Sequence, residues 1–167
     1  MRLAIHYQIG QKVCSELEAD GLRVNKILFL LGNFYPDLVH SYLWCKHEYQ
    51  HSREYIKKKI EKLSKRSFLF SFHLGILAHY ISDYFCYPHS GVYDKNIFHH
   101  ILYELKQKVP ENIIRTKLKI RSFSIEEIGR FVNLYENFRP SFDDDDADHT
   151  DFRIAVNVAA NFLQAAY

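Results

Sequence analysis

A single carboxylate stands alone in the most apolar stretch of the chain. Between residues 67 and 93 the only Asp, Glu, Lys or Arg is Asp83. Burying a carboxylate is costly unless a cation or several hydrogen-bond donors compensate it. His79 stands four positions earlier, one turn away on the same face of a helix, and His89 follows the expected helix end. The pattern predicts a metal site, because histidine nitrogens and carboxylate oxygens are typical ligands of Zn²⁺.

A second pair of the same spacing follows in the next expected helix. His100 and Glu104 are four positions apart and share a face. Ten histidines and 20 acidic residues in 167 make such pairs expected by chance, so their number alone decides nothing. His79 and Asp83 could also form a buried hydrogen-bonded pair without metal. His100 and Glu104 could form an exposed helix pair, and His99 is a rival ligand.

Further histidine and carboxylate candidates lie upstream. Asp37 ends the segment Gly-Asn-Phe-Tyr-Pro-Asp, and His51 follows fourteen residues later. His47 stands four positions before His51 and competes for the same role, although we favour His51. His6, near the start of the first expected helix, would by itself be an ordinary polar position.

The order of these residues resembles that of the zinc-dependent phospholipase C family. The family has the pattern H-x3-D-x5-H followed by H-x3-E, with an Asp and a His fourteen residues apart upstream and an additional early His. The segment LAHYISDYFCYPHSG, residues 77–91, resembles the central family motif along its whole length. The resemblance spans residues 6–104. It implies the all-α fold that this family shares with the P1-type single-strand nucleases.

The resemblance also implies ligands for three zinc ions. For the first ion these are Asp37, His51, His79 and Asp83. For the second they are His89, His100 and Glu104. Asp83 would bridge to a third ion held by His6, which the family completes with the amino terminus of a mature Trp. This chain starts at Met1 and its single Trp is Trp44. We therefore expect two or three ions, with two the better supported number.

Such ions indicate a reaction class. Neighbouring divalent cations clamp a phosphodiester, stabilise the leaving oxygen and lower the pKa of a bound water toward about 7. Asp37 could orient or deprotonate that water. The sequence thus predicts a zinc-dependent phosphodiester hydrolase, and the resemblance implies a phospholipid head group as substrate. The alternatives are a nuclease or nucleotide phosphodiesterase of the same fold, and a non-catalytic zinc-containing helical binding protein.

Composition restricts the classes of protein to which the chain could belong. With 167 residues, 47% apolar and 25% charged, the chain has the size and character of one globular domain over 1–167. A net charge of +2 argues against a dedicated nucleic-acid binder, so nucleic acid is expected only as a substrate. Three cysteines without a C-x-x-C pair favour a reducing compartment. The polar N-terminal residues predict no signal peptide, and we expect a cytoplasmic location.

Helical periodicity recurs along the chain and predicts an all-α fold. Helices are expected at about 3–19, 23–31, 36–44, 48–65, 67–86, 94–108, 110–119, 124–137 and 151–166. The apolar segment 67–86 is expected to be a buried core helix rather than a membrane span, since it contains His73, His79 and Asp83.

Two charged segments have simpler interpretations. Residues 46–66 carry eight Lys or Arg against three Glu, which is typical of a solvated helix face. They could also attract anionic head groups and give peripheral contact with a membrane surface. The acidic residues between 143 and 151 do not fit a calcium loop, and they suit the start of a helix.

Overall fold

The computed structural model describes residues 3–40, 47–63, 67–93, 97–106, 117–139 and 144–165. Within these ranges the description excludes the side chains of residues 40, 97, 100, 104–106 and 144–149. The elements in order are α1 (Leu3–Ala19), α2 (Lys26–His40), α3 (Tyr49–Glu61), α4 (Phe70–Tyr84), the 3₁₀ turn η1 (Tyr87–His89), α5 (Ile97–Lys106), α6 (Ile125–Phe138) and α7 (Asp144–Ala165). The predicted all-α class is confirmed.

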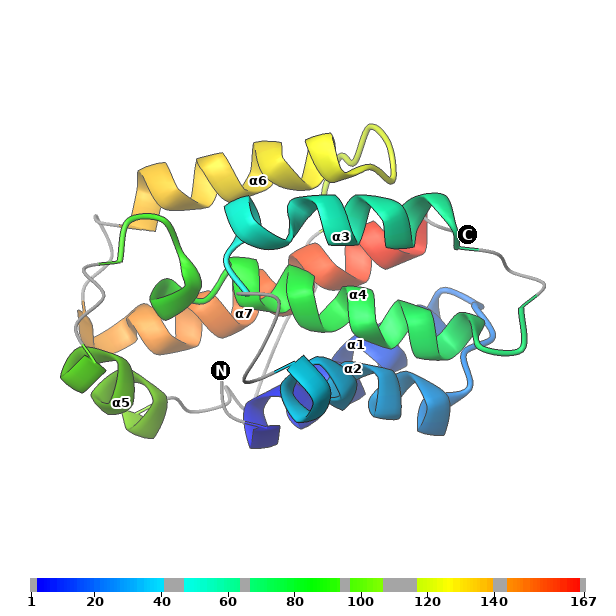
Figure 1. Cartoon of the computed structure of the whole chain (residues 1–167), viewed down its shortest axis with the longest axis horizontal. Coiled ribbons are helices and arrows are strands. Elements are labelled where there is room, and N and C mark those ends of the chain that lie inside the picture. The colour runs from blue at the N-terminus through cyan, green and yellow to red at the C-terminus, as the bar shows by residue number, and fades with distance from the viewer. Residues whose placement is uncertain are drawn as a thin grey trace.

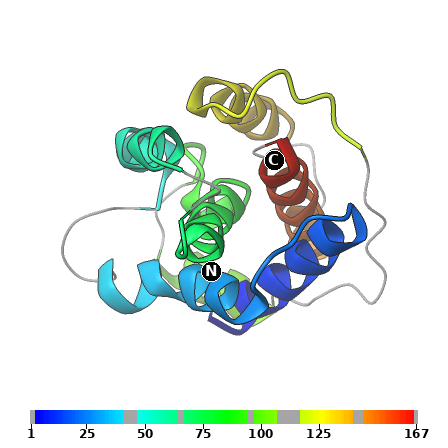
Figure 2. The ribbon, with the colours of Figure 1, turned by 90° about the vertical axis from the view of Figure 1, so that its right-hand side faces the viewer.

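The helices form three layers, with α4 and α7 in the middle one (Figure 1). The α3–α6 layer lies on one side and the α1–α2 layer on the other, as the end-on view in Figure 2 also shows. Helix α4 contacts α1, α2, α3 and α7. Its sequence is apolar on nearly every face, and a helix of that kind is stable only when other elements surround it. The prediction of a buried core helix is therefore confirmed.

Helix α2 crosses α4 at very short range. A Cβ atom added to Gly75 would collide with the main-chain oxygen of Phe29, and one added to Gly32 would collide with that of Phe72. Only glycine permits this backbone approach at both positions. The crossing places the second half of α2 directly against the histidine-bearing face of α4.

The prediction of two short helices over 23–31 and 36–44 is wrong, because α2 continues through Gly32 and contains Pro36. Gly32 acts here as a contact residue rather than a helix end. Pro36 removes one main-chain hydrogen bond and crowds the carbonyl of Gly32 one turn earlier, a local cost that the packing of α2 on α4 outweighs.

Other boundaries follow from local chemistry. Helix α1 ends before Gly21, whose φ of 80° is readily adopted by glycine. Helix α6 begins after Ser124, whose side chain accepts a hydrogen bond from the main-chain N–H of Glu127. The last helix starts at Asp144, earlier than the predicted 151, because an acidic first turn suits the positive end of the helix dipole.

The expected helix over 110–119 falls mostly outside the described residues, and its described part, 117–119, is not helical. There the main-chain N–H of Leu118 donates to Oδ1 of Asn161 on α7 instead of joining a helix.

None of the helices described has both the length and the apolar character that crossing a bilayer requires. The single domain over 1–167 and the cytoplasmic location stay predictions.

Candidate metal centre

The candidate ligands are carried by several elements that meet at one place. His6 lies in the first turns of α1, Asp37 in the last turn of α2, and His79 and Asp83 in the second half of α4. His89 ends η1. The start of α1 and the ends of α2 and α4 converge on the side of the bundle where α5 lies (Figure 1). Residues far apart in sequence thus form one cluster.

Asp83 is the centre of that cluster. Its side chain is completely buried. Oδ2 lies 2.7 Å from Nδ1 of His47 and 3.2 Å from Nε2 of His79. Oδ1 lies 3.2 Å from Nε2 of His6 and 3.9 Å from Nε2 of His89. The two oxygens of one carboxylate therefore face two different pairs of imidazoles.

This surrounding keeps Asp83 ionised. Burial by itself would raise the pKa of the carboxyl, but the surrounding charges, first of all the imidazole of His89, hold that pKa well below its usual value. An anionic carboxylate can bridge two cations when each of its oxygens faces a separate pair of imidazole ligands.

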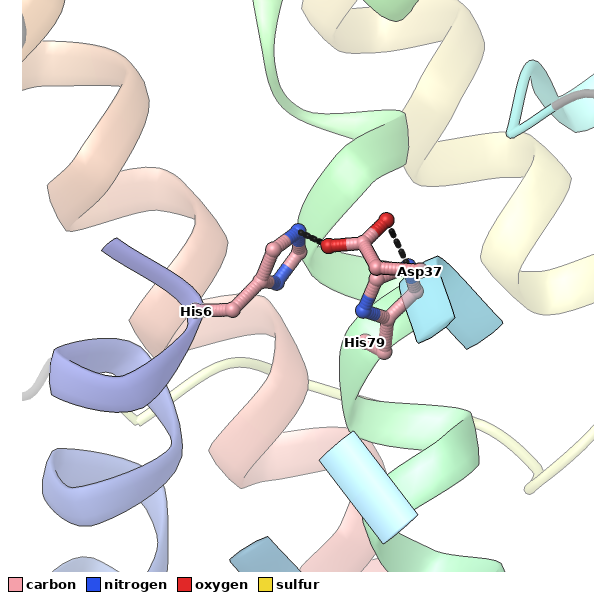
Figure 3. A group of neighbouring side chains, drawn as sticks. All are labelled: His6, Asp37 and His79. Atoms are coloured by element: carbon pink, nitrogen blue, oxygen red, sulfur yellow. Dashed lines mark ion pairs between the residues drawn. The ribbon is translucent and has the colours of Figure 1, made fainter. Parts of the chain in front are cut away.

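Asp37 supplies a second carboxylate that solvent can reach. Figure 3 shows it between His6 and His79, with Oδ2 lying 3.8 Å from Nε2 of His6 and Oδ1 lying 3.7 Å from Nε2 of His79. Oδ1 is also 3.8 Å from Nδ1 of His47. These separations are too long for hydrogen bonds. Burial raises the pKa of Asp37, although its side chain is still 22% exposed.

Three donor atoms together have the spacing that one ion requires, namely Nδ1 of His47, Nε2 of His79 and Oδ2 of Asp83. Oδ1 of Asp37 lies beside the two imidazole nitrogens of this group, at 3.8 Å and 3.7 Å. Nδ1 of His47 and Nε2 of His79 are 3.3 Å apart. A tetrahedral zinc with bonds of about 2.0–2.1 Å holds its ligand atoms about 3.3 Å from one another, which is within the observed range. The groups His6–Asp37–His79 and His47–His79–Asp83 each bring their ligand atoms within 4.8 Å of one another.

His6 gives an independent test of whether a cation fits. Its side chain is completely buried, and neither ring nitrogen makes a hydrogen bond of good geometry, although Nε2 lies 3.2 Å from Oδ1 of Asp83. A buried imidazole without hydrogen bonds is costly, and a metal bond to one nitrogen would remove much of that cost. Burial lowers the pKa of His6 and takes that of His79 to about 4. Both rings are therefore neutral at physiological pH, as metal ligation requires.

Asn33 orients His79 through its main chain. The carbonyl oxygen of Asn33 accepts a hydrogen bond from Nδ1 of His79 at 2.8 Å. This bond leaves the Nε2 lone pair free to point at the two carboxylates. The His6 and His79 rings stack with their centroids 4.0 Å apart, which fixes both planes. The sequence analysis did not identify Asn33, and a main-chain contact leaves no residue-type signal that could have revealed it.

The structure places His47, rather than the favoured His51, beside Asp83. The spacing of four positions made the two histidines rivals, but α3 begins only at Tyr49. His47 therefore precedes the helix and turns inward. His51 lies in the first turn, with Nδ1 2.9 Å from Oε2 of Glu48 and a side chain that is 48% exposed.

His100 and Glu104 both lie on α5, but their side chains are outside the described residues. The rival His99 is exposed. Metal ligation by His100 and Glu104 stays a prediction, as it does for His6, Asp37, His51, His79, Asp83 and His89.

Fold and site together define an all-α protein with a buried cluster of histidines around shared carboxylates, a class in which metal-dependent hydrolysis is common. The family model for zinc dependent phospholipase C matches residues 5–136. The chain belongs to this family, and the recognised resemblance is confirmed. Searches of the curated proteins and of the solved structures gave no significant match.

Proposed function

We propose that this chain is a zinc-dependent phosphodiester hydrolase of the phospholipase C type with a centre of two or three Zn²⁺ ions. The observation that carries the proposal is the division of the Asp83 carboxylate. Oδ2 faces His47 and His79, whereas Oδ1 faces His6 and His89. A buried carboxylate has little reason to collect four imidazoles unless cations lie between them.

The first ion would be held by Asp37, His47, His79 and Asp83. The second would be held by His89 with His100 and Glu104 of α5, and His6 with Asp83 would contribute to a third. When bound, the ions would neutralise the charge of a phosphodiester and lower the pKa of a water toward about 7.

Asp37 is the proposed catalytic residue. Its carboxylate is the more exposed of the two in the cluster, so a water and a substrate can reach it from outside. Oδ1 lies beside His47 and His79, so Oδ2 would stay available to the water when Oδ1 holds the first ion. Asp37 would orient the attacking water and take up its proton.

Partial exposure of the centre favours catalysis over a purely structural zinc site. The side chains of Asp37, His47 and His89 are 22%, 12% and 17% exposed, so the cluster opens to solvent on one side. Structural zinc sites are closed by four protein ligands, whereas catalytic sites keep a position for water. The exposed cations Arg53 and Lys57 on α3, which form only long ion pairs with Glu54 and Glu126, would favour an anionic substrate or membrane surface.

The test is hydrolysis of matched phosphodiesters by the zinc-loaded chain. Choline, ethanolamine and nucleotide phosphodiesters are compared at equal concentration, with Asp83→Asn as the control. Turnover of the lipid-type esters, abolished in the variant, would support the proposal. Preference for the nucleotide esters would favour the nuclease alternative. Stoichiometric zinc with no turnover of any ester would indicate the non-catalytic alternative.

A further inference from the structure

A second buried carboxylate, Asp151 on α7, gathers donors from four other parts of the chain. Oδ2 accepts hydrogen bonds from the main-chain N–H of Tyr87 at 3.2 Å and from the hydroxyl of Tyr103 at 2.6 Å. Oδ1 accepts from the hydroxyl of Tyr135 at 2.8 Å and lies 3.2 Å from Nε of Arg139. The carboxylate thus connects η1, α5, α6 and the residue that follows α6 to the second turn of α7.

The ion pair at the centre of the network is buried. Asp151 is completely buried and Arg139 is only 4% exposed. The Arg139 guanidinium also lies over the ring of Tyr87, 4.3 Å from its centroid. A buried ion pair with these added hydrogen bonds has a fixed geometry, because the loss of any partner leaves polar groups uncompensated.

Two of the tethered elements carry predicted ligands of the second ion. The N–H of Tyr87 opens η1, and His89 ends that turn two residues later. Tyr103 lies on α5 between His100 and Glu104. By contrast, Tyr135 lies on α6, which carries none of the predicted ligands.

We propose that Asp151 is a positioning residue for the second ion, because it holds α5 in a fixed arrangement with η1, whose His89 faces Asp83. This inference rests on the proposed multinuclear zinc centre. Asp151 itself lies too far along the chain to be part of the family match, which ends at residue 136. It acts through the elements that it tethers and does not contact the reacting atoms.

Two conservative variants separate positioning from stability. Tyr103→Phe and Tyr135→Phe each remove one hydroxyl that donates to the same carboxylate. Both leave Asp151 paired with Arg139, so both variants are expected to fold, with similar thermal midpoints. Only Tyr103→Phe loosens the helix that carries predicted ligands. Partners that orient metal ligands typically contribute 10- to 100-fold in metal affinity.

The experiment titrates the full-length wild-type chain and the two variants with Zn²⁺ in competition with a chromophoric chelator. Elemental analysis then counts the bound ions per chain. We expect Tyr103→Phe to weaken the second ion roughly tenfold and leave the first unchanged. Tyr135→Phe should retain both affinities. Asn161→Ala on α7, the helix of Asp151, removes a comparable tether to the main-chain N–H of Leu118 and should also retain the affinities for both ions.

The possible failures are distinguishable. If Tyr103→Phe and Tyr135→Phe change the affinity for the second ion equally, or if neither changes it, the positioning role is wrong and the zinc centre still stands. A wild-type chain that binds fewer than two ions would instead overturn the multinuclear centre, and this inference with it.

Discussion

Nδ1 of His79 donates a hydrogen bond to the main-chain oxygen of Asn33 at 2.8 Å. This contact joins α4 to α2 and turns the other ring nitrogen, Nε2, toward Asp37 and Asp83. It depends on the close crossing of the two helices, where Gly32 and Gly75 leave no room for a side chain. The orientation of a predicted zinc ligand is therefore set by two glycines in the core.

Substituting Gly75→Ala should separate α2 from α4, because the new Cβ would collide with the main-chain oxygen of Phe29. We expect a loss of about 3 kcal/mol in the free energy of unfolding, together with weaker zinc binding. Denaturant unfolding and zinc titration measure the two effects. Gly10→Ala is the matched control, since its Cβ would meet only side-chain atoms, the flexible end of Leu30 at 3.1 Å and the Asn33 amide group at 3.4 Å. Equal stability of the two variants would contradict the packing argument.

Asp83→Asn should abolish multinuclear zinc binding. The carboxamide carries no charge and presents only one oxygen, so it cannot bridge the two pairs of imidazoles. We expect fewer than two ions per chain by elemental analysis and a fall in hydrolysis of at least about a thousandfold, or ~4 kcal/mol. Asp20→Asn, at an exposed position after α1, should change neither quantity. Full activity in Asp83→Asn would mean that the bridging role is wrong.

The variants His47→Gln and His51→Gln distinguish the two rival ligands. His47 contacts Asp83 and His79, whereas His51 is half exposed and pairs with Glu48. We expect His47→Gln to weaken the first ion by roughly a hundredfold or more and His51→Gln to leave it unchanged. Zinc competition titrations provide the measurement. The reverse result would restore His51 to the ligand set.

Zinc binding should release a proton from His47. Burial lowers the pKa of this histidine, but its hydrogen bond to Asp83 together with the negative charges of Asp83 and Asp37 outweighs burial and leaves the pKa above the usual value. A zinc ligand must be neutral, so zinc competes with that proton. Zinc affinity should therefore fall as the pH drops through the raised pKa and level off above it.

Calorimetry of zinc binding in buffers of different ionisation enthalpy counts the released protons. His79, with a pKa near 4, is already neutral above pH 5 and should add none. The same pH profile is expected in His51→Gln. An affinity that does not change between pH 5 and 8 would contradict the role of His47.

Much of the candidate site could be predicted from residue types and spacing. His79 and Asp83 share a helix face because their separation is close to one helical turn, and the lone charge in an apolar stretch marked Asp83 as unusual. The helical class followed from periodicity for the same local reason. These features depend only on neighbours along the chain.

Local patterns failed where packing over long range decided the outcome. Gly32 and Pro36 suggested a break in α2, but close contact with α4 keeps the helix continuous. His47 and His51 were equivalent by spacing, and only the start of α3 at Tyr49 separates their directions.

The sequence by itself determined the helical class, the family and the residue types of the candidate zinc centre. All three can be predicted from hydrophobic periodicity and from short motifs, because these depend on residues close together in the sequence. Tertiary structure decided which oxygen of Asp83 faces which histidine, which histidine turns inward, and that Asp151 ties η1 and α5 to α7. Those facts depend on distances between residues remote in sequence, which only the packing of one helix against another determines.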